Sequence, residues 1–285
     1  MFDMVLPFVI SGLGLGAVYA LSGAGILILY RASGVLNFAF GALGALAAYV
    51  AWSVMDSKFP EPLAWLAGIS VATALAWVYG HWLAPKLAHR ESSVRSIATL
   101  GFALVILGFT EWYWGEAPRR MVLATDAQFL EFFDVRFNYT RLLALGLVVA
   151  MAITVGLLLT RTRMGLKMRA LANDRALSGI LGVRVQQVET VSWVMCGFLA
   201  GIAGILLGNM VRLQATLLTF LVIPALAAVM ISQLKSLPLT VCFALMIGVL
   251  EGCAILIPGF SAYRGTIPFL LALLALVGYR GKRQA

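Results

Sequence analysis

One acid stands apart among the residues that could do chemistry in this chain. Glu251 lies in the run MIGVLEGCAIL and is the only ionisable residue well away from the ends of a predicted apolar segment. A carboxylic acid in such a setting is costly to bury and is by default a candidate functional residue. The alternative is a structural acid satisfied by a neighbouring helix, by a second subunit or by a base such as Arg264. On either interpretation we expect Glu251 to face the interior of a helix bundle.

The common patterns of catalytic, metal and nucleotide sites do not occur in the sequence. His81 and His89 have no HExxH pattern or acid at ligand spacing, and neither GxSxG nor GxxxxGK[ST] is found. We therefore expect no enzymatic activity, metal or cofactor in this chain, and any ATP that drives its work must be bound by partner subunits. Three cysteines lie inside apolar runs without a CxxC spacing and are interpreted as packing residues: Cys196, Cys242 and Cys253.

The composition is that of an integral membrane protein. Of 285 residues 62% are hydrophobic and 12% charged, and the mean hydropathy is +0.97. Long apolar runs indicate a helix bundle rather than a barrel. The net charge of +9 does not indicate nucleic-acid binding, because the bases are spread over many connections instead of one soluble face. We expect one membrane domain over residues 1–285.

Nine apolar runs predict an all-α, polytopic bundle of eight or nine transmembrane helices. The first run is far longer than the apolar part of a signal peptide and should be retained as a span. The second, behind the turn-like RASG, could enter re-entrantly, and the last is short. The runs cover approximately residues 5–30, 36–55, 62–83, 96–113, 141–160, 190–211, 216–233, 238–257 and 265–279.

The distribution of bases predicts the orientation of the bundle. With nine crossings and the N-terminus outside, about two-thirds of the 21 Lys and Arg fall in the inner connections. This bias favours an N-out, C-in topology by the positive-inside rule. It makes residues 161–189, which hold six of those bases, a cytoplasmic loop, and residues 114–140 an extracytoplasmic loop.

Three GxxxG pairs predict close contacts between helices. Glycines four positions apart share one face of a helix and let another backbone approach, within the chain or across a subunit interface. The pairs are Gly12 with Gly16, Gly197 with Gly201, and Gly204 with Gly208.

The cytoplasmic loop has its own helical pattern. We predict a helix from about Gly165 to Ser178, interrupted by Gly179 and Gly182, before the sixth span begins. Its broad apolar face includes Met168, Leu171 and Ala172. Such a face could dock on a partner, and a basic helix lying on anionic lipid is the alternative.

At this loop the sequence resembles the permease subunits of branched-chain amino-acid type ABC importers. The most specific part is GLKMRALANDRALSGILGVRVQQVETVSWVMCGFLAGIAGILLG, which covers Gly165–Gly208. Further matches are LGLGAVYAL, GVLNFAFGALGALAAYV, IATLGFALVILG, WGEAPRR and GVLEG, so the resemblance extends over nearly the whole chain.

The resemblance implies a set of partners and a location. It implies two ABC ATPase subunits that bind ATP, a second permease subunit, a soluble substrate-binding protein and the lipid bilayer of a bacterial inner membrane. It also implies that the cytoplasmic loop couples to the ATPase. The expected coupling residues are Gly165, Met168, Arg169, Leu171, Ala172, Asn173, Gly179 and Gly182, and the expected translocation-path residues are Asn37, Phe40 and Glu251.

Two departures from the family pattern bear on the cargo. Where members usually read NFAHG this chain has Phe40 in place of the histidine, and the turn at Ile231–Pro238 has no glycine. A branched-chain or other hydrophobic amino acid, or a related small organic solute, is the expected cargo, with urea, amide or aromatic-acid specificity as alternatives. For Phe40 a simple packing change is equally open. The competing functions are an ATP-independent carrier, which is disfavoured by the single intramembrane acid, and a membrane scaffold or receptor.

Overall fold

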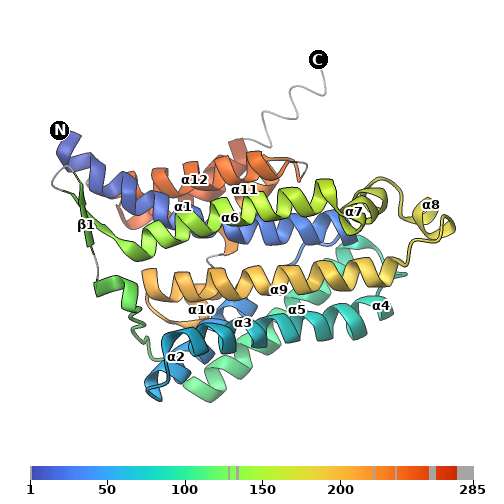
Figure 1. Ribbon diagram of the computed structural model, residues 1–285, viewed down its shortest axis with the longest axis horizontal. Helices are drawn as coiled ribbons and strands as arrows, with labels where there is room; N and C mark the ends of the chain where they lie inside the picture. Colours follow the sequence, from blue (N-terminus) through green and yellow to red (C-terminus); the bar gives the residue numbers. More distant parts are fainter. Residues whose placement is uncertain are drawn as a thin grey trace. The chain divides into compact units, whose positions relative to one another are not determined.

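The computed structural model describes residues 2–127, 129–132, 135–220, 222–234, 236–256 and 261–274, and most of them are helical (Figure 1). The first half of the chain forms α1 (Phe2–Ser33), α2 (Phe40–Asp56), α3 (Glu61–Val78), the π-helical turn η1 (Tyr79–Leu83), α4 (Ala84–Lys86), α5 (Ser92–Trp114) and η2 (Ala124–Ala127). Strands β1 (Phe129–Phe132) and β2 (Val135–Asn138) follow. The second half forms α6 (Tyr139–Arg161), α7 (Arg163–Asn173), α8 (Arg175–Ile180), α9 (Val185–Met210), α10 (Ala215–Phe220), α11 (Val222–Ile231), α12 (Leu237–Cys253), η3 (Ala254–Leu256) and η4 (Ser261–Thr266).

The predicted apolar runs coincide with helices. Within the described residues, six helical stretches are long and apolar enough to cross a membrane: 6–33, 61–86, 92–114, 139–161, 185–210 and 237–256. Two shorter apolar stretches cover the second and seventh runs, and residues 267–274 of the ninth are helical. Residues 221, 235, 257 and 275–279, which complete or flank these runs, lie outside the described residues. The all-α membrane bundle is confirmed, whereas the number of crossings and their orientation stay predictions.

A short hairpin interrupts the helices in the connection at residues 114–140. Strands β1 and β2 pair antiparallel, with Phe129 opposite Asn138 and Phe132 opposite Val135. The sequence analysis predicted a loop here and no strands. The hairpin is short, so its period-2 pattern extends over too few residues to stand out beside the long apolar runs.

The contacts of the chain cluster into two compact units, each made of separate stretches of sequence. Unit 1 contains residues 1–24, 122–150 and 223–285, and unit 2 contains residues 25–121 and 151–222. Three of the dividing points fall inside α1, α6 and α11, and each unit brings together segments that are far apart in the sequence.

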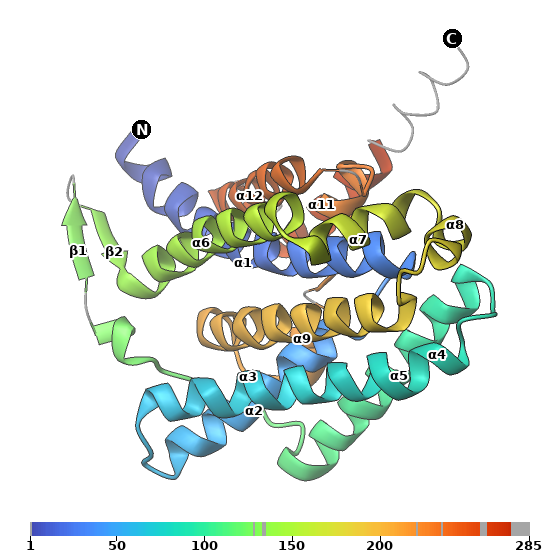
Figure 2. The ribbon, with the colours of Figure 1, turned by 45° about the vertical axis from the view of Figure 1, so that its right-hand side comes forward.

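Close glycine contacts hold the centre of unit 2 together. Helix α9 packs against both α2 and α3 (Figure 2). A side chain at Gly204 would collide with the backbone of Gly44 in α2, and one at Gly197 would meet Ala72 and Ala76 in α3. Two of the predicted GxxxG pairs therefore bring backbones together inside the chain.

The third GxxxG pair does the same in unit 1. A Cβ atom on Gly12 of α1 would lie 2.5 Å from the carbonyl oxygen of Gly248 in α12, and Gly16 faces Leu245 of the same helix. In turn Gly252 of α12 faces Phe8 and Gly12. All three pairs thus serve contacts within one subunit, which decides between the alternatives left open by the sequence.

Candidate functional site

A non-helical stretch between α1 and α2 precedes two of the predicted path residues. Residues 34–39 follow no regular structure, and Gly34 starts them with φ of 69°, a conformation that favours glycine. Backbone groups that leave a helix inside a membrane need other hydrogen-bond partners. In this stretch, side chains supply them.

Helix α5 supplies three of these partners from one face. Ser92 Oγ donates to the Gly34 carbonyl at 2.5 Å, Ser96 Oγ accepts from Leu36 N at 3.2 Å, and Thr99 Oγ1 accepts from Phe38 N at 3.0 Å. Residues spaced by four and three positions lie on one side of a helix, so the pattern S-x-x-x-S-x-x-T forms a ladder along the stretch. The sequence analysis missed this ladder, although the hydroxyl spacing was visible.

Asn37 is fully buried, and its side-chain amide forms hydrogen bonds within the chain. Its Oδ1 accepts from Ala39 N at 2.9 Å, and its Nδ2 lies 3.3 Å from Sγ of Cys196 in α9. The first contact is a local turn that leads the chain into α2. Asn37 therefore lies toward the protein interior as predicted, and its amide shapes the start of α2; its part in a translocation path stays a prediction.

Phe40 packs in the same unit as Asn37. Its ring is buried against Gly25 of α1, where an added Cβ would lie 2.6 Å from Phe40 Cε2, and the same glycine also faces Leu199. The glycine therefore makes room for the aromatic ring. This fit supports the packing explanation for the departure from the family pattern, and the contribution of Phe40 to cargo choice stays a prediction.

Glu251 belongs to unit 1 and is also buried. The hydroxyl of Tyr19 in α1 donates to Glu251 Oε2 at 3.0 Å, next to the glycine contact between α1 and α12. Tyr19 itself is 1% exposed. A polar group on a neighbouring helix therefore satisfies the acid in part, and the side chain of Arg264, the partner considered from sequence, lies outside the described side chains.

The loop at residues 161–189 folds as two helices, so the single helix predicted over Gly165–Ser178 is wrong. Helix α7 ends at Asn173, and Asp174 caps α8 by accepting from Leu177 N at 2.9 Å. An aspartate at this position ends one helix and starts the next, because its short carboxylate binds the free N–H groups of the following turn. Gly179 lies inside α8, while Gly182 has φ of 85° and makes the predicted turn before α9.

The apolar face of α7 is used inside the protein, contrary to the prediction of a docking face there. Met168 is 1% exposed and Leu171 6%, and Gly165 packs on the backbone of Leu158 and Leu159 in α6; only Ala172 of the predicted face is exposed. Amphipathicity shows that a helix buries a face but does not show against what.

Helix α8 and the turn after it expose large apolar side chains. Leu177 is 53% exposed, Ile180 82% and Leu181 75%. In Figure 1 this segment lies at the end of unit 2 that also holds α4. These three residues were not among the predicted coupling residues; of those that were, Arg169, Asn173, Gly179 and Gly182 are exposed, like Ala172.

The start of α9 is tied to α5 by a buried ion pair. Arg95 Nη2 lies 3.4 Å from Glu189 Oε1, and both side chains are at most 10% exposed. Sequence reasoning did not select these two residues, because they are 94 positions apart and only the fold brings them together.

The same part of α9 also contacts the π-helical turn η1. Thr190 Oγ1 donates to the Gly80 carbonyl at 3.3 Å and Gln186 Nε2 to the His81 carbonyl at 3.4 Å. An added Cβ on Gly80 would lie 2.6 Å from Trp193. A π-turn shifts the hydrogen-bond register and frees carbonyls for such contacts, and such turns are frequent at functional positions.

The opposite end of unit 2 is joined by polar and aromatic contacts. Arg119 pairs through its backbone with Leu213, donates to the Trp114 carbonyl at 2.6 Å and stacks over the ring of Trp52 at 4.3 Å. The Tyr49 hydroxyl also donates to Leu213 at 3.3 Å. The WGEAPRR motif therefore joins neighbouring segments at the end of unit 2 that lies away from Glu189.

No metal centre is apparent in the described side chains, among which no group of three or more His, Cys, Asp or Glu residues comes together.

Comparison with known proteins identifies the family. The sequence pattern of the family "Branched-chain amino acid transport system / permease component" matches residues 8–276. This chain belongs to that family. The protein is therefore a multi-pass membrane transport component, and the resemblance inferred from its motifs is confirmed.

Three related permease proteins align with this chain over most of their lengths. The chain is 26% identical to the "Probable branched-chain amino acid transport permease protein LivH" of Methanocaldococcus jannaschii, over 89% of this chain and 84% of that protein. It is 24% identical to the high-affinity branched-chain amino acid transport system permease protein LivH of Escherichia coli K12, over 94% and 91%. Identity to the ribose import permease protein RbsC of Escherichia coli K12 is 25%, over 92% and 82%.

A solved structure has the same fold. PsaBC from Streptococcus pneumoniae, in complex with Fab, matches 97% of this chain and 94% of that chain with a TM-score of 0.50 at 12% identity. This similarity concerns the fold alone, whereas the family and the named relatives are consistent with the permease subunit of an ABC importer.

Proposed function

We propose that this permease is one of two membrane subunits of an ABC importer for branched-chain or other hydrophobic amino acids, or related small organic solutes. The observation that carries the proposal is the uncovered apolar tip of the cytoplasmic loop, formed by Leu177, Ile180 and Leu181. A chain without a nucleotide-binding motif needs a partner that hydrolyses ATP, and large apolar side chains at the end of a membrane bundle provide a surface for it.

Family membership supports the partners that we propose. Two ATPase subunits supply ATP hydrolysis, a second permease completes the membrane domain, and a soluble binding protein delivers the cargo on the outer side. The complex works in the inner membrane of a bacterium, with the α7–α8 loop in the cytoplasm. The permease itself makes or breaks no covalent bond.

Helix α8 is the part of the loop that contacts the ATPase. A short amphipathic helix docks into a groove by burying apolar anchors on one face, and Leu177, Ile180 and Leu181 follow the spacing of such anchors. Met168 and Leu171 are already buried and stabilise α7 on its own chain. The anchors are therefore in α8, not on the α7 face expected from sequence.

A continuous series of contacts connects α8 to the stretch before α2, so that movement of α8 can be transmitted to it. Helix α9 follows α8 after one turn, and Glu189 links it to Arg95 of α5. The next turns of α5 hold residues 36 and 38 through Ser96 and Thr99. A displacement of α9 therefore shifts the non-helical stretch that leads into Asn37 and Phe40, as alternation between two packed states requires.

We assign a role in cargo choice to Phe40, which follows this stretch. Phe40 replaces the family's polar ring by an apolar one, which is compatible with a branched-chain or aromatic side chain as cargo. Glu251 is the acid that we assign to the path in unit 1. Both assignments depend on the importer function.

Cross-linking to the ATPase tests the proposal. With the three native cysteines replaced, single cysteines at Ile180 and Leu181 should cross-link to a single-cysteine ATPase, while one at buried Met168 should not. Vesicles that contain the complete complex should take up cargo only with ATP. An α8 that never cross-links in a complex that still imports with ATP would make the docking assignment wrong. Uptake without any ATPase would instead identify a secondary carrier. A complex that assembles without cargo and shows no uptake would identify a scaffold.

A further inference from the structure

Helix α7 begins where a predicted membrane span ends. Helix α6 has 23 residues, which makes it roughly 35 Å long at 1.5 Å per residue. The hydrocarbon core of a bilayer is about 30 Å thick, so the last turn of α6 reaches the headgroup layer. Thr162 alone separates the two helices, and its Oγ1 caps α7 by accepting from Gly165 N at 3.0 Å. The first turn of α7 therefore starts at headgroup level.

The two sides of α7 differ sharply in character. Gly165, Met168 and Leu171 form the side that is buried in the protein. The helical period puts Arg163, Leu166 and Ala170 at the centre of the opposite side, with Lys167 and Arg169 on its two flanks. Leu166 is 62% exposed, and all three bases are exposed. The α7 outer face, defined by these five residues, is basic with one large apolar side chain.

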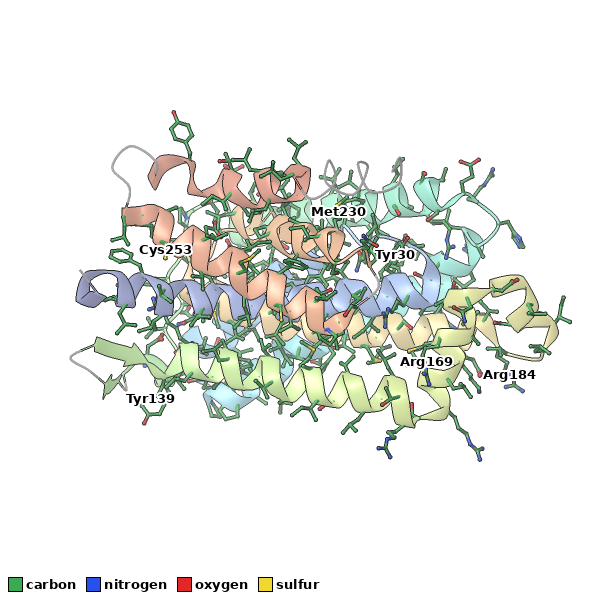
Figure 3. All side chains as sticks on the ribbon, turned by 90° about the horizontal axis from the view of Figure 1, so that it is seen from above. Tyr30, Tyr139, Arg169, Arg184, Met230 and Cys253 are labelled. Carbon is green, nitrogen blue, oxygen red and sulfur yellow. The ribbon has the colours of Figure 1, made fainter. Side chains whose placement is uncertain are left out.

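This charge is not neutralised by nearby acids. No Asp or Glu occurs in the sequence between Asp134 and Asp174, a stretch that also contains Arg161. Within the described part of the chain, the ion pair found is that of Arg95 with Glu189, and no carboxylate pairs with the bases of α7. Figure 3 labels Arg169 on α7 and Arg184 before α9, among the nitrogen-tipped side chains at this end of unit 2.

We propose that the α7 outer face binds the headgroups of anionic phospholipids. A basic helix held at the headgroup layer attracts phosphate groups, and an exposed leucine among the bases can enter the boundary of the acyl chains. The apolar side of α7 stays on its own protein, so the helix does not need to insert to satisfy it. The loop then has two contacts with different chemistry: α7 with lipid phosphate and, beyond the break at Asp174, α8 with protein.

Lipid titration of the full chain tests this inference without any partner subunit. The purified chain in neutral detergent is titrated with phosphatidylglycerol or with phosphatidylcholine of the same acyl chains, and bound lipid is counted by native mass spectrometry. Each base near a membrane surface contributes about fivefold to affinity, so R163Q/K167Q/R169Q should lower phosphatidylglycerol binding on the order of 100-fold. Phosphatidylcholine binding should not change.

The matched control removes three exposed bases elsewhere in unit 2. K86Q/R90Q/R184Q loses the same charge from the α4 end and from the turn before α9, and should lower phosphatidylglycerol binding by less than about fivefold, since these residues are not on α7. In the unmodified chain, raising salt from about 0.1 M to 1 M should weaken the preference for phosphatidylglycerol, because the screening length falls from about 10 Å to 3 Å.

Three results would overturn the proposal. An α7 triple variant that keeps the full phosphatidylglycerol preference would show that this face does not bind the headgroup, and an equal loss in the control would show that net charge alone is responsible. If the α7 variant keeps lipid binding but no longer copurifies with the ATPase, the face belongs to a protein interface instead. The measurement uses the isolated chain, so it does not depend on the importer function.

Discussion

Arg95 and Glu189 form a buried ion pair at 3.4 Å that joins the first turn of α5 to the beginning of α9. Glu189 comes seven positions after Gly182, in the turn between α8 and α9, and Arg95 comes one position before Ser96 of the hydroxyl ladder. The pair therefore links α9, which follows α8, to α5, whose hydroxyl groups bind the stretch that precedes Phe40.

Removing one partner of this pair should be costly. R95A leaves a buried carboxylate without its base, a change that destabilises proteins by about 3–5 kcal/mol. We expect a clear loss of thermal stability in detergent. The control R90A removes an exposed base that precedes α5, and its stability should be close to that of the parent protein. The exchange R95E/E189R should recover part of the loss, and an exchange no better than the single variant would mean that the pair itself contributes little.

The contact between α1 and α12 should not tolerate even a methyl group. A Cβ on Gly248 would collide with the backbone of Gly12 and Gly16, so G248A forces the helices apart. We expect a lower yield of folded protein and an earlier thermal transition. G156A in α6 is the control, since nothing lies within 4 Å of its added methyl, and alanine is the better helix former. Equal behaviour of the two variants would contradict the close contact.

Gly25 and Phe40 should behave as a matched pair. G25A pushes a methyl group to within 2.6 Å of the ring, which should destabilise the protein, and F40L in that background should restore stability by giving way. Additive effects of the two substitutions would count against the contact. F40H then tests cargo: an unchanged order of preferred amino acids in uptake assays would leave Phe40 with a packing role alone.

Glu251 can be tested for shape and charge separately. In E251Q the amide oxygen can still accept from the Tyr19 hydroxyl, so we expect stability close to that of the parent. E251L removes that acceptor and should cost about 1–3 kcal/mol. Thermal unfolding distinguishes the two. Uptake by E251Q across a pH series then decides the role of the charge, and a normal rate throughout would assign Glu251 to structure.

The long apolar helices and the family of this protein can be predicted from its sequence. Apolar runs long enough to cross a bilayer become helices because a backbone in hydrocarbon must satisfy its hydrogen bonds internally, and the nine runs do coincide with helices. The motif at Gly165–Gly208, together with the further matches along the chain, indicated the family. Even the break at Asp174 had a local signal, an N-cap residue three positions before Leu177, which the apolar pattern obscured.

Only the tertiary structure decided which faces meet. A GxxxG pair indicates that another backbone can approach closely, but it does not indicate which backbone. In the fold, Gly12 faces Gly248 and Gly204 faces Gly44 of the same chain. Likewise the periodicity of α7 predicts a buried side without its partner, and in the fold Gly165 packs on α6 while α7 also contacts α9. The pairing of Arg95 with Glu189 depends on two helix ends that meet across 94 positions, and no local pattern encodes such a contact.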